Sequence, residues 1–441
     1  MNGDKLESNL HTFLRHIDSI KDTLPMVMVL MNPYQEKANK KFVDFIENNV
    51  EEIEIEDGEK TLTVKYEESR IFDTLSRNSE ISTLASKIIP ESLFVSLISQ
   101  YDAFLNRLLE NLFEIRPEYL NSSERNLSYS QLVEFKNIDK AREYIIEKEI
   151  ETILRKSHTD HFEYIENKIN IPLRKNLPVW KIFIEITERR NILVHNDGRV
   201  SNQYLTKCRE KKCDLKDVKI NDRLSVTPEY FNNAYACLYE IAVKLTHTIW
   251  RKLLKENLED ADRKLNDICF DLISSGQFAL VDILLEFACN QKQHHNEALK
   301  NVFVVNQSLS QYLQGEKENA KNIIEKKDWS ASSDDFKLAH LVLTEKFEES
   351  YELMIKIGDD GEIDKENYMT WPLFYKLRKE EEFKETFEKI FNEKYNVLEI
   401  PKKPLQEVIE EALEKNPEIK KKTINKADSD KNKEKVKESA E

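Results

Sequence analysis

Apolar residues recur at spacings of three and four along most of the chain, a period that predicts amphipathic helices. The longest such stripe runs from Leu93 to Phe113. Four further helices are predicted in the middle of the chain: Asp139–Arg155, His158–Ile169, Pro178–Asn196 and Thr227–Leu254. Pro178 and Pro228 suit a first helical turn, and Gly198 suits a C-terminal stop. Short connections between these helices favour an up-and-down bundle over residues 91–255.

The first 90 residues have a different, mixed pattern. Apolar spacing predicts one short helix around residues 14–20 and another around residues 42–46. Between Ile53 and Tyr66, apolar and polar residues alternate on either side of Asp57-Gly58. Alternation around such a turn sequence predicts a β-hairpin. We therefore expect a small α+β region over residues 1–90.

The remaining sequence reads as short helices followed by a charged tail. Helices are predicted at Leu265–Ser274, Phe278–Cys289, Ala298–Leu313, Lys317–Glu325, Phe336–Leu343 and Phe347–Ile357. Glycines at the predicted tips make residues 256–400 resemble an α-solenoid, loosely like tetratricopeptide repeats, although the sequence has no strict period. Residues 401–441 are rich in Lys and Glu, and we expect the last twenty or so to be disordered. The fold class expected for the whole chain is mostly α.

Composition excludes several classes of enzyme. The 441 residues include only 7 glycines, and their positions form neither a GxGxxG, a GxxxxGK[ST] nor a GxSxG motif. We therefore expect neither a dinucleotide enzyme, a P-loop enzyme nor an α/β-hydrolase. The net charge of −15 argues against general coating of nucleic acid or anionic lipid. Residues 91–255 are mildly basic, so a polyanionic partner is expected there.

The expected location is the cytoplasm. Five cysteines are an odd number in a large chain, which suits reduced thiols. The first ten residues lack the basic-then-apolar pattern of a signal peptide. The apolar run Met26–Met31 is too short to span a bilayer, so no membrane contact is expected. We expect this run to be part of the core, and we consider a methionine-rich surface that binds a partner to be the less favoured alternative.

The helix that begins at Pro178 carries the most informative residues. Arg189 and Arg190 stand where the apolar stripe Ile182, Phe183, Ile186 and Leu193 would continue. A guanidinium at such a position is costly unless it meets an anion. Asn191 and His195 are four residues apart and share a helix face, and His195 lies in the last turn, where the helix dipole favours the imidazolium. A cation, an amide and an imidazole at one helix end could grip a phosphate and move a proton.

The string from Arg190 to His195, RNILVH, resembles the R-N-x-x-x-H form of the RX4-6H motif of the HEPN superfamily. The resemblance covers about residues 91–255. It implies a helical bundle and a metal-independent endoribonuclease that acts as a homodimer, with the two motifs facing a shared cleft. An enzyme of this kind needs no cofactor. Relatives commonly serve in toxin–antitoxin and phage-defence systems, so the C-terminal repeats are expected to bind a regulatory protein.

The resemblance also implies roles for individual residues. His195 would act on the ribose 2′-hydroxyl as general base or on the leaving oxygen as acid. Arg190 would stabilise the phosphorane-like charge, and Asn191 would orient the phosphate or the imidazole. Asp102, which interrupts the stripe between Tyr101 and Phe104, is the candidate for an auxiliary polar residue. The expected products are a 2′,3′-cyclic phosphate and a 5′-hydroxyl.

An alternative is a non-catalytic HEPN scaffold in which Arg190 is a structural residue paired with Glu188 or Asp102, and the helical repeats bind a partner.

A basic stretch after the motif, interpreted as a loop, could contact an RNA backbone or simply be solvated: Lys207, Arg209, Lys211 and Lys212. Cys208 and Cys213 supply too few ligands for zinc, so no metal is expected.

Overall fold

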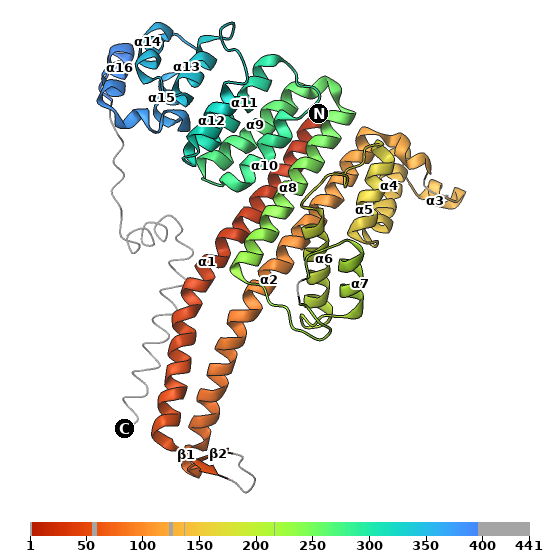
Figure 1. The fold of residues 1–441 in the computed structure, drawn as a ribbon. Helices are drawn as coiled ribbons and strands as arrows, with labels where there is room; N and C mark the ends of the chain where they lie inside the picture. The colour runs from red at the N-terminus through yellow and green to blue at the C-terminus, as the bar shows by residue number, and fades with distance from the viewer. Residues whose placement is uncertain (1, 55–59, 123–126, 136, 216, 396–441) are drawn as a thin grey trace, which may run out of the picture. The chain divides into compact units, whose positions relative to one another are not determined.

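The computed structural model describes residues 2–54, 60–122, 127–135, 137–215 and 217–395, and these residues are mostly helical (Figure 1). They divide into two units. Of the described residues, those up to 350 and residues 370–374 form the first unit, and residues 351–369 and 375–395 form the second. Both predicted boundaries, 90/91 and 255/256, lie inside the first unit. The predicted tail, residues 401–441, lies outside the described residues.

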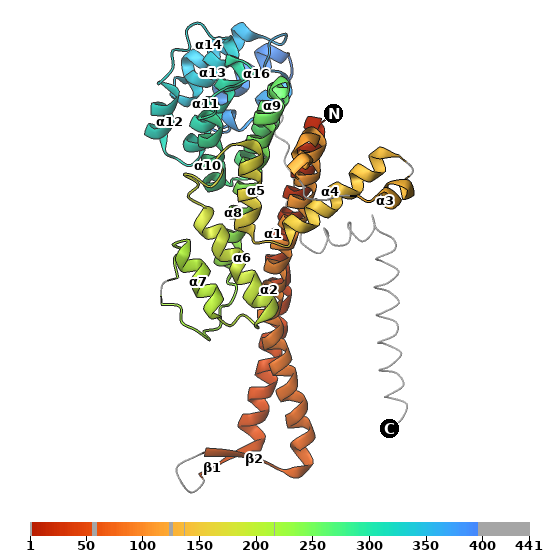
Figure 2. The same ribbon diagram turned by 90° about the vertical axis from the view of Figure 1, so that its right-hand side faces the viewer.

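The first unit begins with a long helical hairpin. Helix α1 (Asn2–Asn49) and helix α2 (Ser69–Ile115) pack side by side, and strands β1 (Val50–Glu54) and β2 (Lys60–Val64) join their far ends (Figure 2). The strands are antiparallel, with Val50 opposite Val64. The predicted hairpin is thus confirmed, although its turn, Asp57-Gly58, lies outside the described residues. The boundary predicted at 90/91 falls within α2.

The expectation of two short helices before the hairpin is wrong, because α1 is continuous. It runs through Pro25 and Pro33. A proline inside a helix removes one backbone hydrogen bond, which normally favours a break. Here α2 packs along α1 on both sides of the prolines, and near the strands Phe42 and Phe45 contact Phe72 with ring centroids 5.6 and 6.4 Å apart. Tertiary packing therefore overrides the local signal.

The middle helices match the predicted ones to within about two residues. They are α4 (Ile138–Leu154), α5 (His158–Ile169), α6 (Trp180–His195) and α8 (Pro228–Leu253). Capping explains two of the starts: the Ser157 side chain accepts from the Asp160 N–H, and that of Thr227 accepts from the Tyr230 N–H. Two short helices were not predicted, α3 (Tyr129–Glu134) and α7 (Asn202–Glu210). Lys207 and Arg209 therefore lie on a helix and not, as expected, in a loop.

Helices that follow α8 pack against their neighbours in sequence. They are α9 (Leu258–Ser274), α10 (Phe278–Cys289), α11 (Glu297–Leu313), α12 (Lys317–Ile324) and α13 (Asp334–Leu343). Gly276 and Gly315 adopt φ values of +71° and +89° between helices, a conformation that glycine adopts without strain. Short 3-10 helices occur at Tyr66–Glu68, Pro117–Ser122, Lys255–Asn257, Pro372–Phe374 and Leu377–Lys379.

The second unit is small. Helix α14 (Phe347–Ile357) begins in the first unit and ends in the second. Within the second unit, the Tyr368 ring on α15 (Lys365–Thr370) contacts Phe391 at the end of α16 (Glu381–Phe391), with centroids 5.9 Å apart. The Arg378 guanidinium donates to the Tyr368 carbonyl at 3.1 Å. These contacts give the unit its own aromatic core.

Helix α2 is long and apolar enough to cross a membrane by length and composition alone, with an 18-residue window of mean hydropathy 1.4. The core helix of a soluble protein passes the same test. Only 28% of that window is buried within the structure, whereas from Phe94 to Phe113 α2 supplies buried residues that pack in the first unit with α1 and α8. Phe104 contacts Phe13 and Tyr101 with centroids 4.9 and 5.9 Å apart. The cytoplasmic location stays a prediction.

Two buried histidines predict a loss of stability at acid pH. His161 is 2% exposed and His247 is 0% exposed. Burial lowers the pKa of His161 to about 4 and that of His247 to about 3. The unfolded chain takes up these protons near pH 6.5 and the folded protein does not, so the free energy of unfolding decreases as pH falls below 6.5. We expect a decrease of about 2 kcal/mol per histidine between pH 7 and pH 5.

Urea unfolding followed by circular dichroism at the two pH values measures this decrease. The matched control is the double variant His161→Phe/His247→Phe, which keeps two buried rings but cannot take up the protons. Its unfolding free energy should change far less between pH 7 and pH 5. An equal change in the wild type and the double variant would contradict the assignment.

Candidate active site

A polar cavity of about 420 Å³ opens beside the motif helix. Three elements besides α6 contribute to it: α2, the junction between α4 and α5, and α7. The charged and hydrogen-bonding residues that line it are Asp102, Arg155, Lys156, Ser157, His158, His161, Glu188, Arg190, Asn191 and Lys207. The structure thus brings Asp102 and Lys207, which the sequence analysis named apart from the motif, together with Arg190 and Asn191 of the motif.

Asp102 is the centre of the cavity's polar contacts. Its Oδ1 lies 2.9 Å from Nε2 of His158, and its Oδ2 lies 3.9 Å from Nη2 of Arg190. Arg190 also donates from Nη1 to Oδ1 of Asn191 at 3.3 Å. The carboxylate therefore orients the His158 ring and leaves part of the Arg190 guanidinium available to a ligand. A carboxylate–histidine pair of this kind fixes the imidazole tautomer.

The cavity carries an excess of positive charge. Arg155, Lys156, Arg190 and Lys207 line it, against the two carboxylates of Asp102 and Glu188. Lys207 pairs with Glu188 at 2.8 Å. The N-terminus of α5 also borders the cavity, and the backbone dipoles there add partial positive charge. The arrangement suits an anion such as a phosphate.

Sequence reasoning missed His158 and His161 as site residues. The two side chains are three residues apart at the start of α5 and so lie on one helix face. Their rings are 5.2 Å apart between centroids. The H-x-x-H spacing directly after Ser157 was the available signal. That signal does not show which distant residue faces the pair, and Asp102 lies 56 residues earlier in the chain.

His195 lies outside this cavity. It is the last residue of α6 and is exposed, and its neighbour Val194 is 47% exposed. Asn196 is the C-cap of α6, and Asp197 and Gly198 after it have positive φ values of 48° and 72°. Asn191 lines the cavity and His195 does not, although the sequence placed both residues on one helix face.

The burial of α6 also differs from the predicted stripe. Ile182 is 47% exposed, whereas Glu185 is buried. Glu185 accepts hydrogen bonds from Tyr204 and Tyr230 at 2.6 Å each, and from Nε of Arg189 at 2.8 Å. Burial is the main cause that raises the pKa of both tyrosines, and the Glu185 carboxylate raises it further. Arg189, which was expected to need an anion, thus meets one within the chain.

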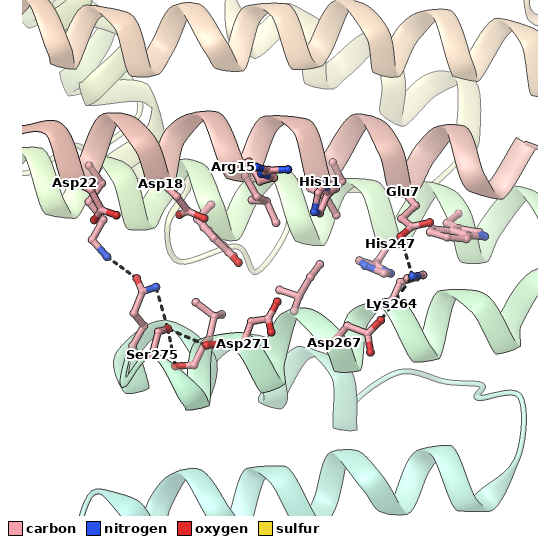
Figure 3. A pocket seen from close by; sticks show the side chains of 18 residues that line it. Glu7, His11, Arg15, Asp18, Asp22, His247, Lys264, Asp267, Asp271 and Ser275 are labelled. Atoms are coloured by element: carbon pink, nitrogen blue, oxygen red, sulfur yellow. Dashed lines mark hydrogen bonds and ion pairs between the residues drawn. The ribbon is translucent and has the colours of Figure 1, made fainter. Parts of the chain in front are cut away.

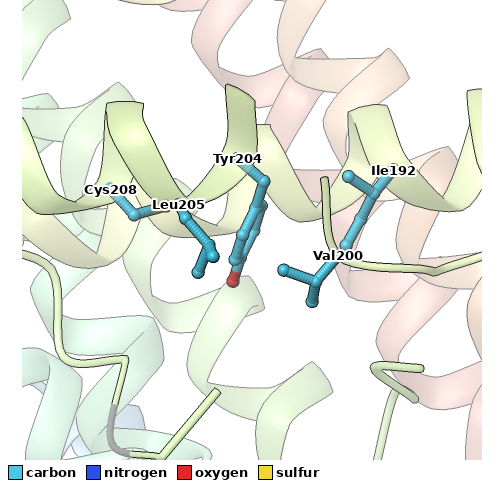
Figure 4. Packing of buried hydrophobic residues seen from close by; sticks show 5 residues of the cluster. All are labelled: Ile192, Val200, Tyr204, Leu205 and Cys208. Atoms are coloured by element: carbon cyan, nitrogen blue, oxygen red, sulfur yellow. The ribbon is translucent and has the colours of Figure 1, made fainter. Parts of the chain in front are cut away.

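Helix α7 is held against α6 by a compact apolar cluster (Figure 4). Its buried members are Ile192, Val200, Tyr204, Leu205 and Cys208. This packing places Lys207 at the cavity, while Arg209, Lys211 and Lys212 do not line it. Cys208 lies inside the cluster, and within the described residues no group of three or more His, Cys, Asp or Glu side chains could hold a metal ion.

The geometry thus unites a guanidinium, an amide, a carboxylate-bound imidazole and several cations around one solvent-accessible cavity. Such groups can hold a phosphate and exchange a proton with it. Known proteins offer no further guide: no match was found among models of protein families, among curated proteins or among solved structures.

Proposed function

We propose that this chain is a metal-independent endoribonuclease of the HEPN type that acts as a homodimer. The observation that carries the proposal is the cation-rich cavity in which Arg190 and Asn191 of the motif meet Asp102 and His158. Its positive charge supports a polyanionic substrate in a chain that is acidic overall. The RNA is held by Arg190 and Lys207, and its backbone extends toward Arg209, Lys211 and Lys212.

In the proposed reaction, the ribose 2′-oxygen attacks the neighbouring phosphorus and the bond from phosphorus to the 5′-oxygen breaks. His195 takes the 2′-hydroxyl proton while water protonates the leaving 5′-oxygen, or His195 protonates the leaving 5′-oxygen while water takes the 2′-hydroxyl proton. Arg190 neutralises charge that develops on the phosphoryl oxygens, and Asn191 orients the phosphate. The products are a 2′,3′-cyclic phosphate and a 5′-hydroxyl. Metal is not required because side chains and water transfer the protons and side chains neutralise the charge.

The dimer is part of the proposal because His195 lies outside the cavity of its own chain. A second copy that packs against the exposed surface around Val194 would bring the two motifs to one cleft. Helices α9–α13 would then form the repeat region that binds a regulatory protein. The biological role that fits such an enzyme is a toxin, an abortive-infection protein or a phage-defence effector.

The first test is RNA cleavage in EDTA by wild type and by His195→Ala. We expect the wild type to cleave and the variant to be slower by about 100-fold or more, because general acid–base catalysis contributes that much. Gel analysis of end-labelled RNA measures the rate. Resistance of the 3′ ends to further labelling, before and after phosphatase treatment, identifies the cyclic phosphate, because phosphatase removes a 3′-monophosphate but not the cyclic diester. The matched control is His295→Ala, which removes another exposed histidine and should cleave at the wild-type rate. Equal cleavage by wild type and His195→Ala would contradict the proposed role.

The second candidate function is a non-catalytic scaffold. It is favoured by the Arg190–Asp102 ion pair, which gives Arg190 a structural partner, and by the exposed position of His195. In this case α9–α13 would bind a partner and the bundle would only dimerise. Expression in cells separates the two candidates. An active enzyme should inhibit growth, and His195→Ala should relieve the inhibition. If the chain is a scaffold, growth should be the same with the wild type and with His195→Ala.

A further inference from the structure

A second cavity, of about 690 Å³, lies in the first unit between α1, α8 and α9, far along the chain from the motif helix (Figure 3). Polar side chains of α1 and α9 face each other across it, and residues of α8 form its floor. We call it the α1–α9 groove. Five carboxylates line it: Glu7, Asp18, Asp22, Asp267 and Asp271. Arg15, Lys21 and Lys264 are the lysines and arginines on its walls.

These three cations neutralise the five carboxylates only in part. Lys264 lies 2.9 Å from Glu7 and 3.7 Å from Asp267, and Lys21 donates to the neutral amide of Gln277. Burial raises the pKa of Asp18, and the carboxylates of Asp22 and Asp271 add to this rise, although the hydrogen bond from Tyr235 and the charge of Lys21 oppose it. Burial and the neighbouring Asp267 likewise raise the pKa of Asp271. The groove therefore holds negative charge that a bound cation would stabilise.

His247 is an independent sign of a ligand. The ring is fully buried from solvent by the chain, yet it lines the groove and is directed between α1 and α9 (Figure 3). In the part of the chain that the structure describes, neither ring nitrogen has a hydrogen-bond partner. A buried polar group without a partner is costly, which favours a ligand or water at this place. The ring is stacked on Trp250 with an angle of 13° between the planes.

The protonation state of His247 decides what it can bind. Burial, with a further contribution from Arg251, lowers the pKa of His247 to about 3, and Asp262 only partly opposes this. The imidazole is therefore neutral at pH 7 and offers one nitrogen as an acceptor. A ligand ammonium group can donate a hydrogen bond to such a nitrogen. A ligand carboxylate or phosphate would instead be repelled by Glu7 and Asp267.

The spacing of the acidic residues excludes a single metal ion. Glu7 and Asp22 are fifteen residues apart on α1, or about 22 Å at the helical rise of 1.5 Å per residue. Among the described side chains, no three potential ligands come close enough for a metal. Arg15 and His11 lie between the two acidic ends of the groove, one at Asp18, Asp22 and Asp271 and the other at Glu7 and Asp267.

We propose that the α1–α9 groove binds a linear aliphatic polyamine, with its ammonium groups at the two acidic ends and its methylene chain along the apolar floor. Nine bonds separate the terminal nitrogens of a triamine, so it can reach from Glu7 and Asp267 to Asp18 and Asp271, which are only four residues from Asp267 on α9 and eleven from Glu7 on α1, but not to Asp22. Its flexible chain lets both ends be contacted at once while Arg15 is bypassed. Leu14, Tyr239 and Leu272 provide apolar surface for the methylenes. The aromatic faces of Tyr239 and Trp250 add attraction for a cation. This proposal does not depend on RNA cleavage.

Isothermal titration of the full-length protein with spermidine tests the proposal. We expect saturable 1:1 binding to the wild type, at least tenfold weaker binding to Asp18→Asn and Asp271→Asn, and unchanged binding to Asp260→Asn. Asp260 is an exposed residue of α9 outside the groove, so its variant controls for the loss of one negative charge. Asn at position 18 can still accept the hydrogen bond from Tyr235, which preserves the fold.

Two further measurements make the outcome specific. Spermidine should change the tryptophan fluorescence of the wild type, and Trp250→Phe should lose most of that change. Magnesium chloride at the same ionic strength should neither give saturable heat nor change the fluorescence. Binding of spermidine that is no stronger than that of magnesium, or equal binding by wild type, Asp18→Asn and Asp271→Asn, would overturn the proposal.

Discussion

Arg190→Ala is expected to lower the rate of RNA cleavage by about 100- to 1,000-fold, the loss found when one group that stabilises transition-state charge is removed. The guanidinium lines the cavity, and its two contacts are long, 3.9 Å from Nη2 to Asp102 and 3.3 Å from Nη1 to Asn191, so a phosphate can compete for both nitrogens. Arg190→Lys should be more active than Arg190→Ala but less active than the wild type. The lysine ammonium keeps the positive charge but lacks the planar, two-pronged donor geometry of the guanidinium. Single-turnover cleavage of a labelled oligonucleotide measures both variants.

The neighbouring residue provides the matched control. Arg189 bonds to buried Glu185 and stacks on Tyr230, with its guanidinium carbon 3.9 Å from the ring centroid. Arg189→Ala would leave a buried carboxylate without its cation, so it should lower the free energy of unfolding by about 2–4 kcal/mol. Arg190→Ala should change stability by less than about 1 kcal/mol. If Arg190→Ala unfolds the protein and leaves the folded fraction fully active, Arg190 is structural and the scaffold interpretation holds.

The positions of most helices could be predicted because their signals are local. Thr227 before Pro228, Ser157 before His158, and the glycines at 276 and 315 mark helix ends within a few residues of sequence. Helices α10 and α14 were predicted at their observed bounds. Because these signals are local, they also led to the wrong prediction for α1. Pro25 and Pro33 favour a break in the helix, but packing against α2 keeps the helix continuous.

The candidate site could be predicted only in part. RNILVH identified Arg190 and Asn191, and the interrupted stripe of α2 identified Asp102. His158 could not be identified in this way, because its contact with Asp102 depends on how the α4–α5 junction meets α2. The buried face of α6 was mispredicted for a related reason. Phenolic hydroxyls of Tyr204 and Tyr230, from two other helices, donate to Glu185 and allow a carboxylate to be buried outside the predicted apolar stripe.

The second large effect is expected at Asp262, a fully buried carboxylate on α9. Its Oδ1 lies 2.6 Å from Nη2 of Arg251 on α8 and 3.0 Å from Nδ1 of His294, and its Oδ2 accepts from the His295 N–H at 2.7 Å. Burial alone would raise the pKa of Asp262, but these hydrogen bonds and the Arg251 charge hold it below its usual value. One carboxylate therefore joins α8, α9 and the connection between α10 and α11.

Asp262→Ala should lower the free energy of unfolding by about 3–5 kcal/mol, because it leaves the buried Arg251 guanidinium without its anion. Asp262→Asn should cost less, since the amide can still accept one of the hydrogen bonds. Urea unfolding at pH 7, followed by circular dichroism, measures both changes. Asp260→Ala, two residues earlier on the exposed face of α9, is the matched control and should change stability by less than about 0.5 kcal/mol. Equal stabilities of the Asp262→Ala and Asp260→Ala variants would mean that the α8–α9 contact is held by apolar packing and not by this ion pair.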